Sequence, residues 1–392
     1  MTYNVHPVFI GVAAGAALGA TYEYFVPAQS NEFSHNYRPQ PSRSMSASST
    51  PSNLSPPKRI GGKFTDARRA QLRKIGEETL DTIHRGHYTL RGVEYSLKEK
   101  VKESKKSTEY YPPDAGLDQW AATPKPQRTG GPDGISLPTH ISILEISTMD
   151  AARLLESVYT NNPGEICTTG VLNFASATKP GGGFQNGAEA QEESIARAST
   201  LYPTLMTDNA QKFYKLHKLE NEQNARAYYS HAMIYSPKIT VFRDDDGLWT
   251  RPFDVDVLTC AAVNAGEILK NTVGPTTSGV NVSIEKEMTE RMGRILFLFE
   301  QKGVRNIVLG TFGTGVFKND IATVTRIWAS LLLLPTARFL DSFDRIIFAV
   351  TGEDTFANFN SGFEAWANPK ASGTNAGRGK GVKTSYSYRL GI

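Results

Sequence analysis

One connection between a strand and a helix organises this sequence of 392 residues: Val171-Leu-Asn-Phe-Ala-Ser-Ala-Thr-Lys-Pro-Gly-Gly-Gly-Phe-Gln-Asn-Gly-Ala-Glu-Ala-Gln-Glu-Glu193. It opens with an apolar run and closes on Gln191, Glu192 and Glu193, where a helix is expected to begin. The three glycines at 181–183 have no Cβ, so their backbone can adopt positive φ and approach a ligand closely. Acids at a helix start ordinarily cap it, but the glycines in the same connection favour a ligand-binding loop.

A second glycine-rich connection has the same character: Gly310-Thr-Phe-Gly-Thr-Gly-Val-Phe-Lys-Asn-Asp320. It follows an apolar run and precedes a helical pattern, so its backbone N–H groups and the helix N-terminus can converge on an anion. A diphosphate is the ligand that such a loop would be expected to bind. Phe312 and Phe317 either stack on a sugar or base or belong to the core.

Strand and helix patterns alternate from about Thr65 to Phe363, which predicts a three-layer α/β/α fold with a mainly parallel sheet. The expected strands are Ile141–Ser147, Gly170–Ala175, Asp256–Ala262, Asn306–Gly310 and Arg345–Val350. The expected helices are Asp66–Gly86, Thr148–Tyr159, Gln191–Leu201, Asn209–Tyr228, Ser283–Gly303 and Asp320–Leu340. In such folds ligands bind at the carboxyl ends of the strands, where both glycine-rich connections begin.

Composition and motif spacing exclude several classes of protein. Lys and Arg total 43 against 39 Asp and Glu, so a net charge of +4 argues against nucleic-acid binding by bulk charge. Cys167 and Cys260 are expected to be buried, reduced thiols, and no spacing typical of a zinc site occurs. The P-loop spacing at Gly274–Gly279 fails because Val280 replaces the required lysine, and no GxSxG motif is present.

The two ends of the chain differ from its middle. We expect residues 1–28 to form an apolar, Gly/Ala-rich helix, 29–63 a disordered Ser/Pro-rich linker, 64–365 the folded region and 366–392 a flexible basic tail. The uncharged run at residues 8–22 carries a repeated GxxxG and is shorter than the ~20 residues of a membrane span. Membrane association through this run, a soluble helix and a cleaved signal all stay open.

Taken together, the two loops resemble the bacterial-type poly(ADP-ribose) glycohydrolases, a branch of the macrodomain superfamily. That family's signature is GGG followed by QEE, here at 181–183 and 191–193. Leu172–Pro180, His231–Gly247 and Arg69–Tyr88 are similar to further segments of the family. The resemblance runs from Asp66 to near Phe363 and implies a macrodomain-like three-layer α/β/α fold with a mixed, mainly parallel sheet and extra N-terminal helices.

The resemblance implies hydrolysis of the ribose–ribose O-glycosidic bond of poly(ADP-ribose), with ADP-ribose as product. Glu193 matches the family's catalytic acid, whose pKa is expected to be raised, and Glu192 would hold a ribose hydroxyl. Neither a metal nor a cofactor is implied. The implied substrate-binding residues are Asn173, Ser176, Gly181, Gly182, Gly183, Phe184, Gln191, Thr311, Phe312, Gly313, Thr314, Gly315, Val316 and Phe317.

Two other functions remain open at this point: hydrolysis of mono-ADP-ribose from proteins, and non-catalytic ADP-ribose binding. The expected partners are poly(ADP-ribose) or an ADP-ribosylated protein, and the core is expected to be monomeric. An intracellular location, cytoplasmic or nuclear, is expected. Phe312 and Thr314 stand where bacterial members tend to carry Trp and Cys, and Ser176 where vertebrate-type members carry Asn.

Overall fold

The computed structural model describes residues 66–126, 138–160, 168–224, 227–272 and 277–367. Its α-helices are α1 Asp66–Arg85, α2 Lys98–Ser107, α3 Thr148–Thr160, α4 Gln191–Ala198, α5 Leu201–Leu205, α6 Asp208–Asn224, α7 Ala265–Lys270, α8 Thr277–Gln301, α9 Ile321–Leu332 and α10 Glu353–Ala367. Its strands are β1 His87–Leu90, β2 Val93–Ser96, β3 Glu109–Tyr111, β4 His140–Leu144, β5 Thr169–Phe174, β6 Met233–Arg243, β7 Trp249–Cys260, β8 Asn306–Leu309 and β9 Arg345–Ala349. Two short 3₁₀ helices, η1 Leu117–Ala121 and η2 Phe184–Asn186, complete the described elements.

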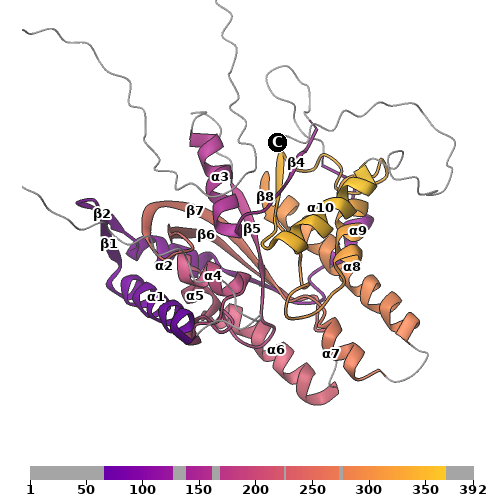
Figure 1. The fold of residues 1–392 in the computed structure, drawn as a ribbon, viewed down its shortest axis with the longest axis horizontal. Coiled ribbons are helices and arrows are strands. Elements are labelled where there is room, and N and C mark those ends of the chain that lie inside the picture. The colour runs from indigo at the N-terminus through magenta and orange to yellow at the C-terminus, as the bar shows by residue number, and fades with distance from the viewer. Residues whose placement is uncertain (1–65, 127–137, 161–167, 225–226, 273–276, 368–392) are drawn as a thin grey trace, which may run out of the picture. The chain divides into compact units, whose positions relative to one another are not determined.

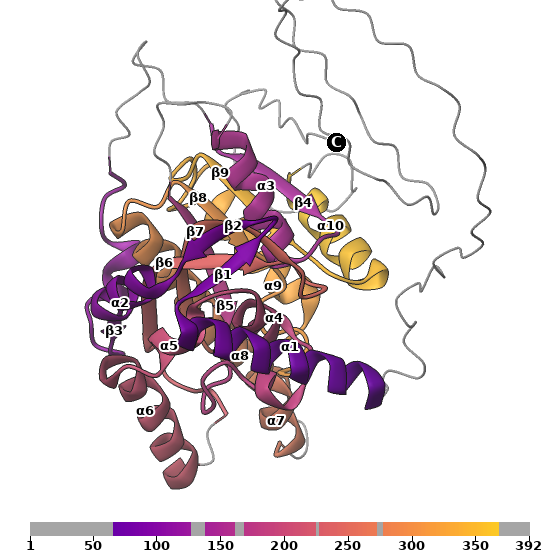
Figure 2. The same ribbon diagram turned by 90° about the vertical axis from the view of Figure 1, so that its left-hand side faces the viewer.

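The main sheet has seven strands in the order β3-β6-β7-β5-β8-β9-β4 (Figure 1). Strands β7, β5, β8, β9 and β4 pair in parallel, whereas β6 is antiparallel to both β3 and β7. The prediction of a mixed, mainly parallel sheet is therefore confirmed. A separate antiparallel hairpin, β1-β2, was not predicted; it lies between α1 and α2 in the chain (Figure 2).

Helices cover both faces of this sheet, because its central strands are apolar on both sides. Two successive residues of β5, which point to opposite faces of the sheet, show this. Val171 packs with α3, α4, α5 and α6, and Leu172 packs with α8, α9 and α10. Each side chain is fully buried. The result is the predicted three-layer α/β/α arrangement, with one core on each face of the sheet.

Several element boundaries differ from the prediction. The strand β7 begins at Trp249 rather than 256, and α9 ends at Leu332 instead of reaching 340. The strand β6, missed in the sequence, contains Pro237 at a register shift between Ser236 and Ile239, where the missing N–H is tolerated. The predicted helix 191–201 corresponds to α4 followed by α5, and the predicted helix 209–228 corresponds to the shorter α6. The helix predicted at 283–303 corresponds to α8, which begins earlier, at Thr277.

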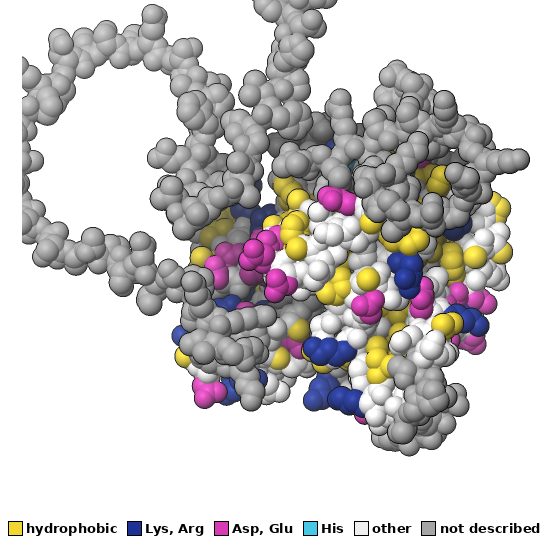
Figure 3. Space-filling model, turned by 45° about the vertical axis from the view of Figure 1, so that its right-hand side comes forward, with side chains coloured by type: hydrophobic (Ala, Val, Ile, Leu, Met, Phe, Trp, Pro, Cys, Tyr) yellow, Lys and Arg dark blue, Asp and Glu magenta, His cyan; other side chains and the backbone are white. Residues whose placement is uncertain are grey.

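Of the predicted segments at the two ends, residues 1–63 and most of 366–392 lie outside the described residues, and α10 extends two residues past the boundary at 365. Cys167 also lies outside them, whereas Cys260 is a buried free thiol. Among the helices of the described ranges, none is long and apolar enough to cross a membrane. On the face in Figure 3, basic, acidic and apolar side chains are interspersed, as the small net charge suggests.

Candidate active site

The two glycine-rich loops leave neighbouring parallel strands and meet at one edge of the sheet. The first loop follows β5, the second follows β8, and the two strands are paired with Val171 opposite Val308. The strand β7, on the other side of β5, ends at the same edge, with Cys260 opposite Phe174. The topology therefore brings together loops that are more than 100 residues apart in the chain.

In the first loop, two glycines adopt the backbone conformation that the sequence predicts. Gly181 has φ of 68° and Gly182 has φ of 60°, both in the left-handed region. A Cβ added to Gly182 would lie 2.2 Å from Oε1 of Glu193, so the carboxylate would have to move. Glycine at 182 thus allows the loop to reach the carboxylate.

Glu193 lies in the first turn of α4, with 9% of its surface exposed. Its Oε1 accepts a hydrogen bond of 2.8 Å from the backbone N–H of Gly183. Its Oε2 accepts no hydrogen bond from any side chain or backbone group that the structure describes. One oxygen is therefore held by the protein and the other is left for a ligand.

The neighbouring carboxylate, Glu192, is almost completely buried and fastens the first loop. Its Oε2 accepts a hydrogen bond of 2.6 Å from the N–H of Ser176, and its Oε1 accepts one of 3.1 Å from the N–H of Gly181. The amide of Asn173 donates to Oε1 at 3.4 Å. Burial raises the pKa of Glu192 to about 8, although these hydrogen bonds lower it. The charge of Glu193 raises the pKa further.

Three of the predicted substrate-binding side chains have partners or close packing within the protein. The amide of Gln191 accepts from the N–H of Phe174 at 2.8 Å and donates to the carbonyl of Leu172 at 2.7 Å, so both its ends are occupied. Asn173 is fully buried, Phe184 is 1% exposed and Gln191 is partly buried. Contact of these three side chains with substrate stays a prediction.

In the second loop, Gly313 and Asn319 close a tight turn. Gly313 has φ of 78°, and a Cβ there would lie 2.5 Å from Cβ of Ala262. The Asn319 amide donates to the carbonyl of Gly313 at 3.0 Å and to the carbonyl of Val263 at 2.7 Å. Asn319 thus ties the loop after β8 to the segment after β7; it was missed in the sequence, where a polar residue among glycines gives no signal of its partners.

The tip of the second loop carries the unused backbone donors. Among the described residues, the N–H groups of Gly315, Val316 and Phe317 donate to no protein acceptor, and Val316 is 79% exposed. A Cβ on Gly315 would meet nothing within 4 Å. The expected help from the α9 N-terminus is reduced, because Asp320 caps that helix by accepting from the N–H of Thr323 at 2.8 Å.

The two aromatic residues of the second loop have different surroundings. Phe312 is fully buried and packs edge-on against Phe174, with ring centroids 5.6 Å apart, so its ring belongs to the core and cannot stack on a ligand here. Phe317 is half-buried and packs against Tyr229 at 5.8 Å. The sequence did not predict Tyr229 as a neighbour of this loop. Thr311 and Thr314 hydrogen-bond to each other through the Thr314 hydroxyl at 3.0 Å.

A buried arginine supports the segment that carries Tyr229. Arg291 is fully buried and donates to the carbonyls of Tyr228, Tyr229 and Ala261 at 2.9–3.0 Å. The segment before β6 and the end of β7 are therefore held by one side chain of α8. Within the described ranges, no group of three or more His, Cys, Asp or Glu side chains is arranged to hold a metal ion.

The fold and the loops define an α/β protein of the macrodomain type, with its site at the carboxyl ends of β5 and β8. The family model for the catalytic domain of microbial-type PARG, the poly(ADP-ribose) glycohydrolases, matches residues 76–244. The crystal structure of poly(ADP-ribose) glycohydrolase from Thermomonospora curvata is similar, with 33% identity and a TM-score of 0.64 over 76% of this chain and 99% of that one. The same protein bound to the inhibitor ADP-HPD matches with a TM-score of 0.62 over 75% of this chain and 98% of that one, again at 33% identity.

The poly(ADP-ribose) glycohydrolase from Deinococcus radiodurans, in complex with ADP-ribose, is 29% identical. It matches with a TM-score of 0.56 over 71% of this chain and 100% of that one. None of the curated proteins compared with the chain matches it. The chain belongs to the microbial-type poly(ADP-ribose) glycohydrolase family.

Proposed function

We propose that this chain hydrolyses the ribose–ribose O-glycosidic bond of poly(ADP-ribose) and releases ADP-ribose, with Glu193 as its single general acid. Membership of the family supports the reaction and the substrate class. The observation that carries the assignment of the acid is the position of Glu193, held through Oε1 against Gly183 with Oε2 left unpaired.

The reaction needs one proton at the leaving oxygen. The protonated carboxyl group of Glu193 gives it to the ribose oxygen as the bond from the anomeric carbon breaks, and an oxocarbenium-like ribose forms. Water then adds to that carbon and returns a proton to the carboxylate. Adjacent helix positions point ~100° apart, so Glu192 and Glu193 cannot flank the bond as the paired carboxylates of other glycosidases do.

Glu192 has a different role in this proposal. Its hydrogen bonds to Ser176 and Gly181 hold the loop that precedes the acid, and any contact with a ribose hydroxyl would be made from this anchored position. The second loop would cradle the diphosphate of ADP-ribose through the N–H groups at 315–317, with Phe317 beside the ribose.

A comparison of two substrates tests the function. Purified protein is incubated with poly(ADP-ribose) and, separately, with mono-ADP-ribosylated protein, and free ADP-ribose is measured. We expect release from the polymer. Release from the mono-modified protein alone would favour a mono-ADP-ribosyl hydrolase, and binding of ADP-ribose without release from either substrate would favour a binding module.

We further propose that residues 64–365 act as a monomeric catalytic unit in the cytoplasm or nucleus. In this proposal residues 29–63 are a linker and residues 366–392 a basic tail. Residues 8–22 would decide membrane association. The Ser/Pro-rich composition of 29–63 and the three glycines at 11, 15 and 19 support this division.

A further inference from the structure

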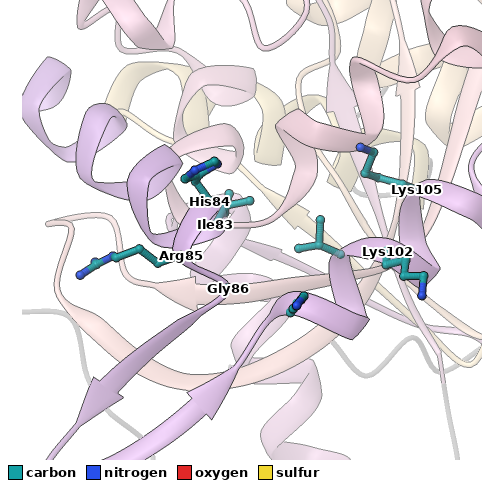
Figure 4. Close-up of a pocket in the computed structure, with 8 residues that line it drawn as sticks. Ile83, His84, Arg85, Gly86, Lys102 and Lys105 are labelled. Carbon is teal, nitrogen blue, oxygen red and sulfur yellow. The ribbon is translucent and has the colours of Figure 1, made fainter.

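The last turn of α1 and the helix α2 line an open surface cavity of about 380 Å³ that is separate from both glycine-rich loops (Figure 4). Its charged lining consists of His84 and Arg85 from α1, and of Lys98, Lys102 and Lys105 from α2. Figure 4 shows the α1 side chains on one side of the cavity, and Lys102 and Lys105 on the other. No acidic residue of the described chain lines it.

Backbone contacts set the shape of this cavity. Gly86 ends α1 with φ of 82°, and its carbonyl accepts hydrogen bonds from the N–H groups of Leu97 and Lys98 at 2.7 and 3.1 Å. Lys98, Lys102 and Lys105 are spaced i, i+4 and i+7, so they share one face of α2. The fold thus holds a row of lysines against the end of α1.

Most of these cations have no acidic partner among the described residues, although Arg85 donates a hydrogen bond to Oγ1 of Thr82 at 3.0 Å. Glu99 lies 3.7 Å from Lys102, with both side chains more than three-quarters exposed, and Glu103 pairs with Lys238 instead. Across the part of the chain that the structure describes, no carboxylate lies within 4.0 Å of Arg85, Lys98 or Lys105. Like charges on one helix face repel each other, so an anion bound among them would be stabilising.

A neighbouring cavity limits the basic surface. It measures about 550 Å³ and shares His84 and Arg85, but its lining also contains the acids Glu78 and Asp81. Glu78 is already paired with Arg243 at 3.2 Å. The cationic region therefore begins at Arg85 and continues over α2.

The same helix α1 connects this cavity to the catalytic loop. A Cβ on Gly76 would lie 3.3 Å from the ring of Phe184, and a Cβ on Gly187 would come still closer to the backbone carbonyl of Arg69. From Gly76 to Arg85 the helix advances ~14 Å, at 1.5 Å per residue. Every unit of poly(ADP-ribose) carries a diphosphate, so a polymer held at the catalytic loop brings further anions near this surface.

We propose that the cavity between α1 and α2 is a second phosphate-binding site, which holds a diphosphate of polymer units that are not being cleaved. This inference rests on the proposed function. The site would increase affinity for long chains and leave the binding of a single ADP-ribose unchanged, because only a polymer can occupy both sites.

The test uses the full chain with Arg85→Gln, Lys98→Gln and Lys105→Gln combined. The matched control removes three exposed lysines from α6: Lys212→Gln, Lys215→Gln and Lys218→Gln. For long polymer, we expect KM of the cavity variant to rise roughly tenfold, with kcat unchanged. The slope of log KM against log salt concentration should become shallower by about 2. Its affinity for free ADP-ribose, by calorimetry, and its melting temperature should match those of the control.

An equal KM for the two triple variants would overturn the proposal. So would a loss of ADP-ribose affinity in the cavity variant, because the site would then not be separate. Single-stranded RNA with the same number of phosphates should compete weakly; competition equal to that of the polymer would overturn the assignment to poly(ADP-ribose).

Binding of polymer to Glu193→Gln protein, with and without the cavity substitutions, separates this inference from the proposed function. Cavity-dependent binding without ADP-ribose release by the unaltered chain would refute the function and support the site. Release by the unaltered chain with cavity-independent binding would support the function and refute the site.

Discussion

Gly182 and Glu193 are so close that a side chain on the glycine would displace the carboxylate: a Cβ on Gly182 would lie 2.2 Å from Oε1 of Glu193 and 2.8 Å from its carboxyl carbon. The signature glycines and the signature acid therefore form one structural unit. Ten residues of sequence separate the hydrogen-bonded pair Gly183 and Glu193, yet the loop returns its N–H to the carboxylate at 2.8 Å.

Gly182→Ala should displace Glu193 and reduce turnover of poly(ADP-ribose) at least ~100-fold, the lower end of what loss of general acid catalysis costs. Gly92→Ala is the control, because Gly92 also has positive φ, 79°, but nothing lies within 4 Å of an added Cβ. Both variants should lose about 1–2 kcal/mol of stability from backbone strain. Equal turnover in the two variants, measured beside their melting temperatures, would contradict the coupling.

The raised pKa of Glu192 predicts that stability depends on pH. Between the ordinary carboxyl pKa of 4.5 and about 8, the folded chain keeps a proton that the unfolded chain has lost. The free energy of unfolding should therefore fall as pH rises through this window, by as much as ~1.4 kcal/mol per unit of pKa difference.

Denaturant unfolding of Glu192→Gln and of the unaltered chain at pH 5 and pH 8 measures this effect. The variant should lose the part of the pH dependence that comes from Glu192, although its absolute stability falls because an amide accepts fewer hydrogen bonds. Glu77→Gln, at an exposed position of α1, serves as control and should keep the pH dependence of the unaltered chain. An unchanged slope in Glu192→Gln would show that Glu192 is ionised in the folded chain.

In the second loop, Gly315→Val should weaken ADP-ribose binding roughly tenfold, because its branches would cover the free N–H groups at 315–317. The melting temperature should not change, since the position faces open space. Gly313→Val, by contrast, should lower the melting temperature as well, because Ala262 and Asn319 leave no room for a Cβ. Unimpaired ADP-ribose binding by Gly315→Val, measured by calorimetry, would contradict the role of this loop.

The N-terminal segment should be dispensable for catalysis. A chain that begins at Phe64 should match the full chain in turnover and differ from it in membrane fractionation. The linker of 35 residues, 29–63, would span ~30–35 Å as a flexible coil, enough to separate the catalytic unit from the first helix. Loss of activity would place the N-terminus in the catalytic unit, and identical fractionation would contradict the membrane role of residues 8–22.

The sequence predicts the parallel strands because their runs are apolar on both faces, and it predicts both loops because each one follows such a run and contains several glycines. Gly170–Ala175 and Asn306–Gly310 were thus placed within one residue of β5 and β8. Strand β6 was missed because Pro237 interrupts its pattern, and tolerance of that proline depends on a bulge against β7.

Within the site, the sequence indicates the chemistry better than it indicates individual contacts. Gln191 belongs to the signature and Asn173 lies on the strand before it, but their partners, such as Leu172 and Thr259, become neighbours only in the folded sheet. Asn319 is missed for the same reason: its acceptor Val263 is 56 residues away in the sequence. Hydrogen bonds between distant segments leave no local pattern to read.

The central claim is that Glu193 donates the proton, and Glu193→Gln tests it most directly. Glutamine keeps the shape and an oxygen that can accept the Gly183 N–H, but its amide does not donate a proton to a leaving oxygen. ADP-ribose release from poly(ADP-ribose) should fall ~10²–10⁴-fold, whereas ADP-ribose affinity by calorimetry should stay within a few-fold of the unaltered chain. Turnover retained at the level of the unaltered chain would contradict the assignment of Glu193 as the acid.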